Sequence, residues 1–103
     1  MTAIIIQTTC GCKKEAKKIA KLLVKEKLAA CVQFQKIKSV YEWKNELCVD
    51  KEVLLSIKTK KENFEIIQRK IKDNHSYDLP EIVAIDISNA SNEYLQFIEG
   101  NTK

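Results

Sequence analysis

The residues best able to bind a metal ion gather near one turn late in the chain. The only histidine, His75, precedes the only proline, Pro80, and Glu81 follows that proline directly. Imidazole is a ligand for copper, zinc and nickel, and carboxylate oxygen suits harder ions. The spacing of His75 and Glu81 across a turn allows the two side chains to approach each other but does not require them to do so. The alternatives are an exposed His75 without a role and a surface ion pair of Glu81 with Lys58.

Two cysteines, Cys10 and Cys12, flank a glycine and offer a second kind of metal site. We expect this stretch to be a flexible loop, in which two thiolates can hold Cu(I) linearly, whereas zinc would want four ligands. The alternative is a pair of ordinary surface thiols, because this spacing is a weak signal by itself. Cys31 and Cys48 fall within predicted strands. We expect Cys31 to be a small buried hydrophobe and Cys48 to be more exposed.

Catalysis by a nucleophilic side chain needs a positioned base. The single histidine allows only a pairing of Cys10 or Cys12 with His75, and no acid–base pair has an informative spacing. We therefore expect a protein that is not an enzyme and carries no organic cofactor.

Composition indicates one soluble domain over residues 1–103, with 45% hydrophobic and 31% charged residues. No apolar run approaches the ~20 residues of a membrane span, and the N-terminal segment does not resemble a signal peptide, so we expect a cytoplasmic protein without a membrane partner. The net charge of +4 comes from lysines, with Arg69 the only arginine. We interpret the lysines of residues 13–25 as a solvated helix face rather than a nucleic-acid site, because no aromatic residues interleave with them.

These candidate residues must be positioned by a regular series of predicted elements. Helical and alternating apolar patterns assign each element its type. They predict strands at 3–8, 28–35 continuing to 37–43, 47–58 and 81–88, and helices at 13–27, after a capping box at 59–62, and at 91–99 with Gly100 as the stop signal. Residues 44–46 read as a hairpin tip, because asparagine tolerates the positive φ of tight turns.

The order of elements predicts an α+β fold. It matches the ferredoxin-like βαββαβ arrangement, an antiparallel sheet with two helices on one face, here with a long hairpin and a short C-terminal helix. If extended, residues 28–43 would run about 53 Å, whereas a domain of this size is roughly 34 Å across. The hairpin must therefore bend, overhang or be covered, and its tip carries Tyr41 and Trp43. We predict a homo-oligomer that buries the hairpin and the open sheet face.

Several segments, taken together, resemble one known family. They are residues 27–32 (KLAACV), 41–43 (YEW), 53–59 (VLLSIKT), 75–82 (HSYDLPEI) and 93–97 (EYLQF). In this order and spacing they resemble the CutA divalent-cation-tolerance proteins over nearly the whole chain. The resemblance implies a ferredoxin-like homotrimer, similar in build to PII-type signalling proteins, with clefts between subunits. It also implies a role in the response to metal ions, with copper or another divalent cation bound.

The resemblance carries over to the candidate site residue by residue. The family's proposed metal site combines a first-strand cysteine, a histidine near the end of the second helix and the glutamate after the proline. His75 and Glu81 match the last two. Threonines occupy the end of the first strand, near Thr8, so Cys10 or Cys12 would have to substitute. Ser76, Lys44, Asn45 and Phe97 also depart from the family pattern.

Two functions from different classes remain open at this point. The first is a CutA-like homotrimer that binds copper or another divalent cation through His75, Glu81, Cys10 and Cys12. The second is a PII-like regulatory or scaffold trimer whose inter-subunit cleft takes a small anionic ligand or a partner protein. In either case we expect Lys58, Tyr77, Trp43 and Tyr41 to line the cleft.

Overall fold

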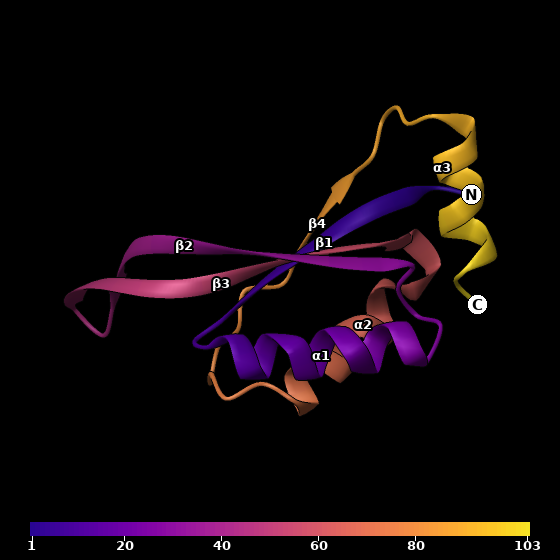
Figure 1. The fold of residues 1–103 in the computed structure, drawn as a ribbon. Coiled ribbons are helices and arrows are strands. Elements are labelled where there is room, and N and C mark those ends of the chain that lie inside the picture. Colours follow the sequence, from indigo (N-terminus) through magenta and orange to yellow (C-terminus); the bar gives the residue numbers. More distant parts are fainter.

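Four antiparallel strands form one sheet in the order β2-β3-β1-β4, and helices α1 and α2 cover one of its faces (Figure 1). The computed structural model describes residues 1–103. Its elements are β1 (Ala3–Cys10), α1 (Lys13–Lys25), β2 (Cys31–Trp43), β3 (Glu46–Lys60), the 3₁₀ turn η1 (Lys61–Asn63), α2 (Phe64–Asp73), β4 (Val83–Asp86) and α3 (Asn92–Gly100). The expected α+β, ferredoxin-like fold is confirmed.

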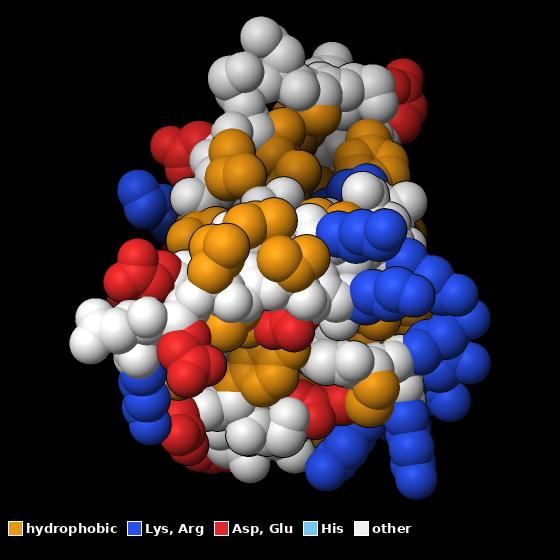
Figure 2. Space-filling view, turned by 90° about the vertical axis from the view of Figure 1, so that its left-hand side faces the viewer, with side chains coloured by type: hydrophobic (Ala, Val, Ile, Leu, Met, Phe, Trp, Pro, Cys, Tyr) orange, Lys and Arg blue, Asp and Glu red, His pale blue; other side chains and the backbone are white.

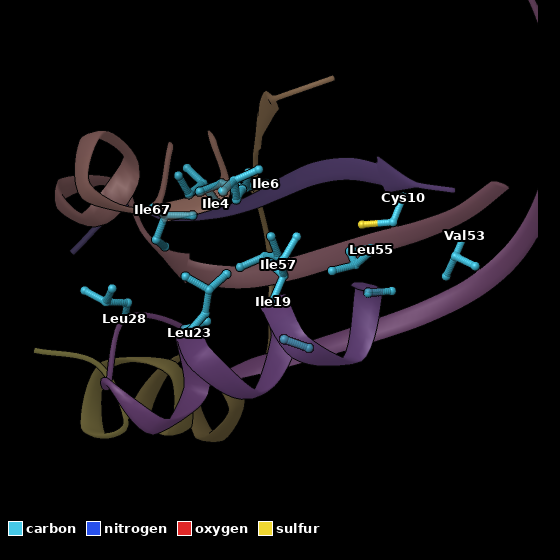
Figure 3. Close-up of a cluster of buried hydrophobic side chains, with 14 residues drawn as sticks. Ile4, Ile6, Cys10, Ile19, Leu23, Leu28, Val53, Leu55, Ile57 and Ile67 are labelled. Atoms are coloured by element: carbon cyan, nitrogen blue, oxygen red, sulfur yellow. The ribbon is translucent and has the colours of Figure 1, made fainter. Parts of the chain in front are cut away.

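The core lies between this sheet face and the two helices. Ile6 on β1 pairs with Ile57 on β3, and both are fully buried. Ile19 and Leu23, one helical turn apart, point from α1 toward these strands (Figure 3). Removing each of these large side chains from water stabilises the fold by about 1.5–3 kcal/mol, so the spacing of apolar residues decides which face of each element turns inward.

Helices α1 and α2 leave the opposite sheet face open, and α3 packs beside β3 at one end of it, where Tyr94 contacts Lys58. Val83 and Ile85 of β4 lie on it, 44% and 48% exposed, beside β1. α3 lies at the end of the molecule remote from the hairpin tip (Figure 1). The helices lack the length and the hydrophobicity that a membrane-spanning helix requires.

The hairpin of β2 and β3 extends beyond α1 as an arm, here defined as residues 37–52 (Figure 1). The molecule measures 45 Å along its longest axis and 25 Å along the next. Lys44 and Asn45 close the tip with φ of 51° and 66°, as expected of a two-residue hairpin turn. Large apolar side chains are exposed on both arm faces: Val40, Leu47 and Val49 on one, Tyr41 and Trp43 on the other.

The predicted junction between the first helix and the second strand was placed wrongly. α1 ends at Lys25, and β2 starts only at Cys31. Lys27 adopts a left-handed φ of 60°, and the amides of Leu28 and Ala29 both donate to the carbonyl oxygen of Leu23. The chain therefore reverses where the pattern predicted continuous helix and then strand. Such a reversal usually requires glycine, and lysine gave no signal for it.

Three other predicted boundaries also differ. Thr59 does not cap α2: its hydroxyl donates to the carbonyl of Leu28 at 2.6 Å, and the 3₁₀ turn separates it from the helix. β4 covers four residues of the predicted eight, because only these pair with β1. Gly100 is the last residue of α3 and has no positive φ, so Asn101, not Gly100, caps that helix.

Candidate functional site

His75 is a buried anchor rather than an exposed loop residue. It follows α2, and its side chain is fully shielded from solvent against the end of β1. Its Nε2 lies 2.7 Å from the carbonyl oxygen of Thr9, and its Nδ1 lies 3.1 Å from the amide of Tyr77. A carbonyl only accepts and an amide only donates, so Nε2 carries the proton and Nδ1 accepts. The interpretation of His75 as solvent-exposed is wrong.

Cys10 and Glu15 complete a cluster around this imidazole. The Sγ atom of Cys10 lies 3.8 Å from Nε2 of His75, and Oε1 of Glu15 lies 3.3 Å from Nδ1. Glu15 also accepts the amide hydrogen of Ser76 at 3.1 Å. One ligand atom from each of the three residues falls within 4.8 Å of the other two. We call this set, Cys10, Glu15 and His75, the thiol–imidazole cluster.

Three separate parts of the fold position the cluster: the end of β1, the first turn of α1 and the loop after α2, which carries His75. Cys10 is the last residue of β1, where its side chain turns into the core beside Val53 (Figure 3). Glu15 lies in the first turn of α1. The expectation that Cys10 lies in a flexible loop is therefore wrong, because β1 is two residues longer than its apolar pattern predicted.

Burial keeps the Cys10 thiol protonated far above neutral pH. Loss of solvation raises its pKa from 9.0 to about 12, and the Glu15 carboxylate adds to the shift. Thiolate, imidazole and carboxylate together suit soft or borderline cations such as copper and zinc. The donor set therefore fits such an ion, provided that the ion displaces the thiol proton and competes with Thr9 for Nε2.

The other two predicted metal ligands lie elsewhere. Cys12 is exposed at the N-cap of α1. Glu81 lines a separate cavity of about 460 Å³ and makes no ion pair with Lys58. The chain's ion pairs join Lys70 to Glu26 and His75 to Glu15.

The cavity that Glu81 lines brings together three of the four residues predicted for the cleft. Tyr41, Trp43 and Tyr77 line it together with Glu52 and Glu81. The hydroxyl of Tyr77 donates to Glu52 at 2.9 Å, and burial with this hydrogen bond raises the pKa of Tyr77 well above its usual value. We call it the aromatic cavity.

Lys58, the fourth predicted cleft residue, lies away from the aromatic cavity. Its ammonium group sits 5.1 Å from the ring centre of Tyr94 on α3, a cation–π contact near the other end of the sheet.

Two acidic residues of these sites were missed. Glu15 is the only acidic residue between residues 13 and 25, and this isolation among lysines was an available signal. Glu52 is only 8% exposed, which is unusual for a glutamate because charged side chains are rarely buried. Its alternation with Lys51 and Val53 could have placed it on the sheet face opposite the core, but no pattern indicated Tyr77 as its partner.

Comparison with known proteins gives one consistent result. The family model described as "CutA1 divalent ion tolerance protein" matches residues 4–101. The chain is 35% identical over 100 residues to the divalent-cation tolerance protein CutA of Pyrococcus horikoshii, covering 97% of this chain and 98% of that protein. It is 38% identical to the chloroplastic protein CutA of Arabidopsis thaliana, of which it spans 56%.

Solved structures agree with the sequence comparison. The periplasmic divalent cation tolerance protein CutA from Archaeoglobus fulgidus superimposes with a TM-score of 0.96 at 35% identity, covering 98% of this chain and 99% of that one. The protein from Thermus thermophilus gives a TM-score of 0.94 at 37% identity, with 98% and 99% covered.

Proposed function

The chain belongs to the CutA1 divalent ion tolerance protein family, and from this premise we propose that it binds copper or another divalent cation in the response to metal ions. The single observation that supports binding is the thiol–imidazole cluster, whose three ligand atoms fall within 4.8 Å of one another. In this proposal the carboxylate of the site is that of Glu15, which lies beside Nδ1 of His75, rather than that of Glu81.

Metal binding at this cluster requires an exchange of protons. Cys10 is a neutral thiol at pH 7, so an ion that binds its sulfur must release that proton. If an ion bound Nε2 of His75, the neutral ring would carry its proton on Nδ1 and could donate a hydrogen bond to the Glu15 carboxylate, which lies 3.3 Å away. A carboxylate that holds the far nitrogen of a ligating histidine orients the ring and strengthens it as a ligand.

We further propose that the active form is a cytoplasmic homotrimer without enzymatic activity. Two features support assembly: the arm exposes apolar side chains on both faces, and the open sheet face carries Val83 and Ile85. Such surfaces are more often covered than left in water. The number of subunits rests on the family resemblance.

Competition titration against a chromogenic Cu(I) chelator, repeated with zinc, tests the metal site. We expect Cys10→Ser to weaken binding at least tenfold, and Glu15→Gln to weaken it less. Cys12→Ser is the matched control, because Cys12 is an exposed thiol two residues away. In weakly buffered solution the wild type should release a proton on binding, and Cys10→Ser should release less.

Two outcomes would contradict this assignment. Equal affinities of the wild type and Cys10→Ser would remove the cluster as the site. Equal losses for Cys10→Ser and Cys12→Ser would favour linear coordination by the two thiols instead.

The aromatic cavity favours one form of the alternative, a PII-like regulatory or scaffold trimer. Three carboxylates, those of Glu52, Asp78 and Glu81, line it with three aromatic rings and no basic residue. Such a cavity suits a cationic group of a ligand or partner rather than an anion. Thermal-shift screening with metals and with organic cations distinguishes the two functions, because a ligand that binds only the native state raises the melting temperature.

A further inference from the structure

A third site, which shares only Glu52 with the aromatic cavity, lies between the start of α1 and the base of the arm. It is a cavity of about 500 Å³, and its polar lining consists of four lysines and one glutamate: Lys13, Lys36, Lys38, Lys51 and Glu52. Its volume falls within the range of small-molecule sites, about 300–1,000 Å³. We call it the lysine cavity.

Strand register places three of these lysines on one sheet face. Lys36 pairs with Val53, and Lys38 pairs with Lys51. Val53 belongs to the core beneath α1, so the three lysines lie on that same face, just beyond the N-terminus of the helix. Lys13 reaches the cavity from the first residue of α1. In the face that Figure 2 shows, most of the visible Lys and Arg side chains gather on the right-hand side.

These lysines are arranged in a way that opposes folding. Lys38 and Lys51 are direct cross-strand partners, and like charges at such positions repel. None of the four lysines forms an ion pair, because the chain's two ion pairs involve Lys70 and His75. Glu52, the one acidic residue that lines the cavity, alternates with Lys51 onto the opposite sheet face, where its carboxylate accepts the Tyr77 hydroxyl. Local arrangements that cost stability are expected at functional sites.

The start of α1 adds unused hydrogen-bond donors to this charge. Gly11 and Lys13, which line the cavity, flank the N-cap residue Cys12. The side chain of Cys12 caps no amide, although this position normally carries an acceptor. Glu15, the only acid in the first turn, is engaged by His75 and Ser76. First-turn amides and the helix dipole attract anions.

We propose that the lysine cavity binds a small anion with two or more linked phosphate groups. Four ammonium groups around one cavity match several negative charges better than the single charge of a surface carboxylate, and their mutual repulsion is relieved when such an anion binds. The site belongs to one subunit, uses no residue of the thiol–imidazole cluster and does not depend on metal binding.

Isothermal titration with inorganic tripolyphosphate in metal-free buffer tests the proposal. We expect the double variant Lys38→Ala/Lys51→Ala to bind at least tenfold more weakly than the wild type. The ligand-free variant should melt at the same temperature as the wild type or higher, because the repulsion is gone. The matched control, Lys17→Ala/Lys18→Ala, removes the same charge from exposed positions of α1 outside the cavity. It should keep the affinity within twofold.

Four other results of these titrations would contradict the proposal. Equal losses in the two double variants, or equal competition by a single-stranded oligonucleotide in both, would indicate a general basic surface. Orthophosphate binding as tightly as tripolyphosphate would contradict the need for linked phosphates, and no measurable binding would remove the site. Cys10→Ser should keep its tripolyphosphate affinity, so failure of the metal site is distinguished from failure of this one.

Discussion

The sulfur of Cys10 and Nε2 of His75 lie 3.8 Å apart, although 65 residues separate them in the chain. Between them they join the end of β1 to the loop that follows α2. The contact is made inside the protein, where the thiol is fully buried and the imidazole has two hydrogen-bond partners from the backbone. The same two side chains are therefore both structural and the best placed for metal chemistry.

Replacing His75 should destabilise the protein even without metal. His75→Ala leaves the carbonyl of Thr9 and the amide of Tyr77 without partners in a buried place, at a cost of about 2–4 kcal/mol. His75→Gln should lose less, because its amide can still donate to Thr9. Ser76→Ala is the control, since its bond to Glu15 uses the backbone amide. Urea unfolding measures all three, and equal stability of His75→Ala and the wild type would contradict the role.

Stability should fall at high pH because of Cys10. Burial raises the pKa of this thiol from its ordinary value of 9.0, which applies to the unfolded chain, to about 12 in the folded protein. The folded state therefore holds a proton that the unfolded state loses, so this contribution is complete below pH 9 and disappears as the pH rises toward 12. The limiting slope for one proton is about 1.4 kcal/mol per pH unit.

The control for this pH effect is Cys10→Ala. Lysines and tyrosines titrate in the same range, so the informative quantity is the difference in unfolding free energy between wild type and variant, measured in reductant. That difference should shrink from pH 9 to pH 11. A constant difference would contradict the raised pKa.

The hydrogen bond from Tyr77 to Glu52 should contribute strongly, because Glu52 is a buried carboxylate without a basic partner. Tyr77→Phe should cost about 1–3 kcal/mol. A double-mutant cycle with Glu52→Ala should show that most of this loss is shared by the pair. Tyr94→Phe is the matched control, because the Tyr94 ring packs against Phe97. Additive losses in the cycle would exclude the interaction.

Lys27 offers a stabilising substitution. Its φ of 60° is unfavourable for any residue with a Cβ atom, and glycine adopts it freely. Lys27→Gly should raise the unfolding free energy by about 0.5–1 kcal/mol. Lys25→Gly, inside the last turn of α1, should lower it by a similar amount. Thermal unfolding distinguishes the two signs, and a loss in both variants would contradict the left-handed geometry.

Charges on the arm should weaken assembly. Leu47 and Val49 are 78% and 64% exposed in the isolated chain. Leu47→Lys/Val49→Lys should therefore lower the mass measured by light scattering at micromolar concentration. Val24→Lys, an exposed apolar position on α1, should leave it unchanged. A monomeric wild type would overturn the proposed trimer.

The sequence predicted the layout of this protein better than its junctions. Alternation in residues 53–57 and helical spacing in residues 16–23 gave the correct sheet and helix faces, because burial of apolar side chains decides both. The turn at Lys27 was not predicted, because packing of Leu28 beneath the helix maintains its conformation and no residue type that favours such a turn is present.

The candidate site was less accessible from sequence. The resemblance indicated His75, but the contact with Cys10 depends on where β1 ends and on how the loop after α2 returns to it. Neither follows from spacing along the chain. Glu15 entered the cluster only through the three-dimensional fold, since its helix is otherwise lined with lysines.

Two hydrogen bonds of Tyr77 connect the arm to the thiol–imidazole cluster. Glu52, at the base of the arm, accepts the Tyr77 hydroxyl, and the Tyr77 amide donates to His75, whose ring centre lies 4.8 Å from that of Tyr77. An ion that moves the His75 proton to Nδ1 ends the bond to the Tyr77 amide. If neighbouring subunits contact the arm, ion binding and assembly are coupled. The factor by which assembly changes the affinity for the ion then equals the factor by which the ion changes the affinity between subunits. Metal concentration would thereby set how tightly the oligomer is held together.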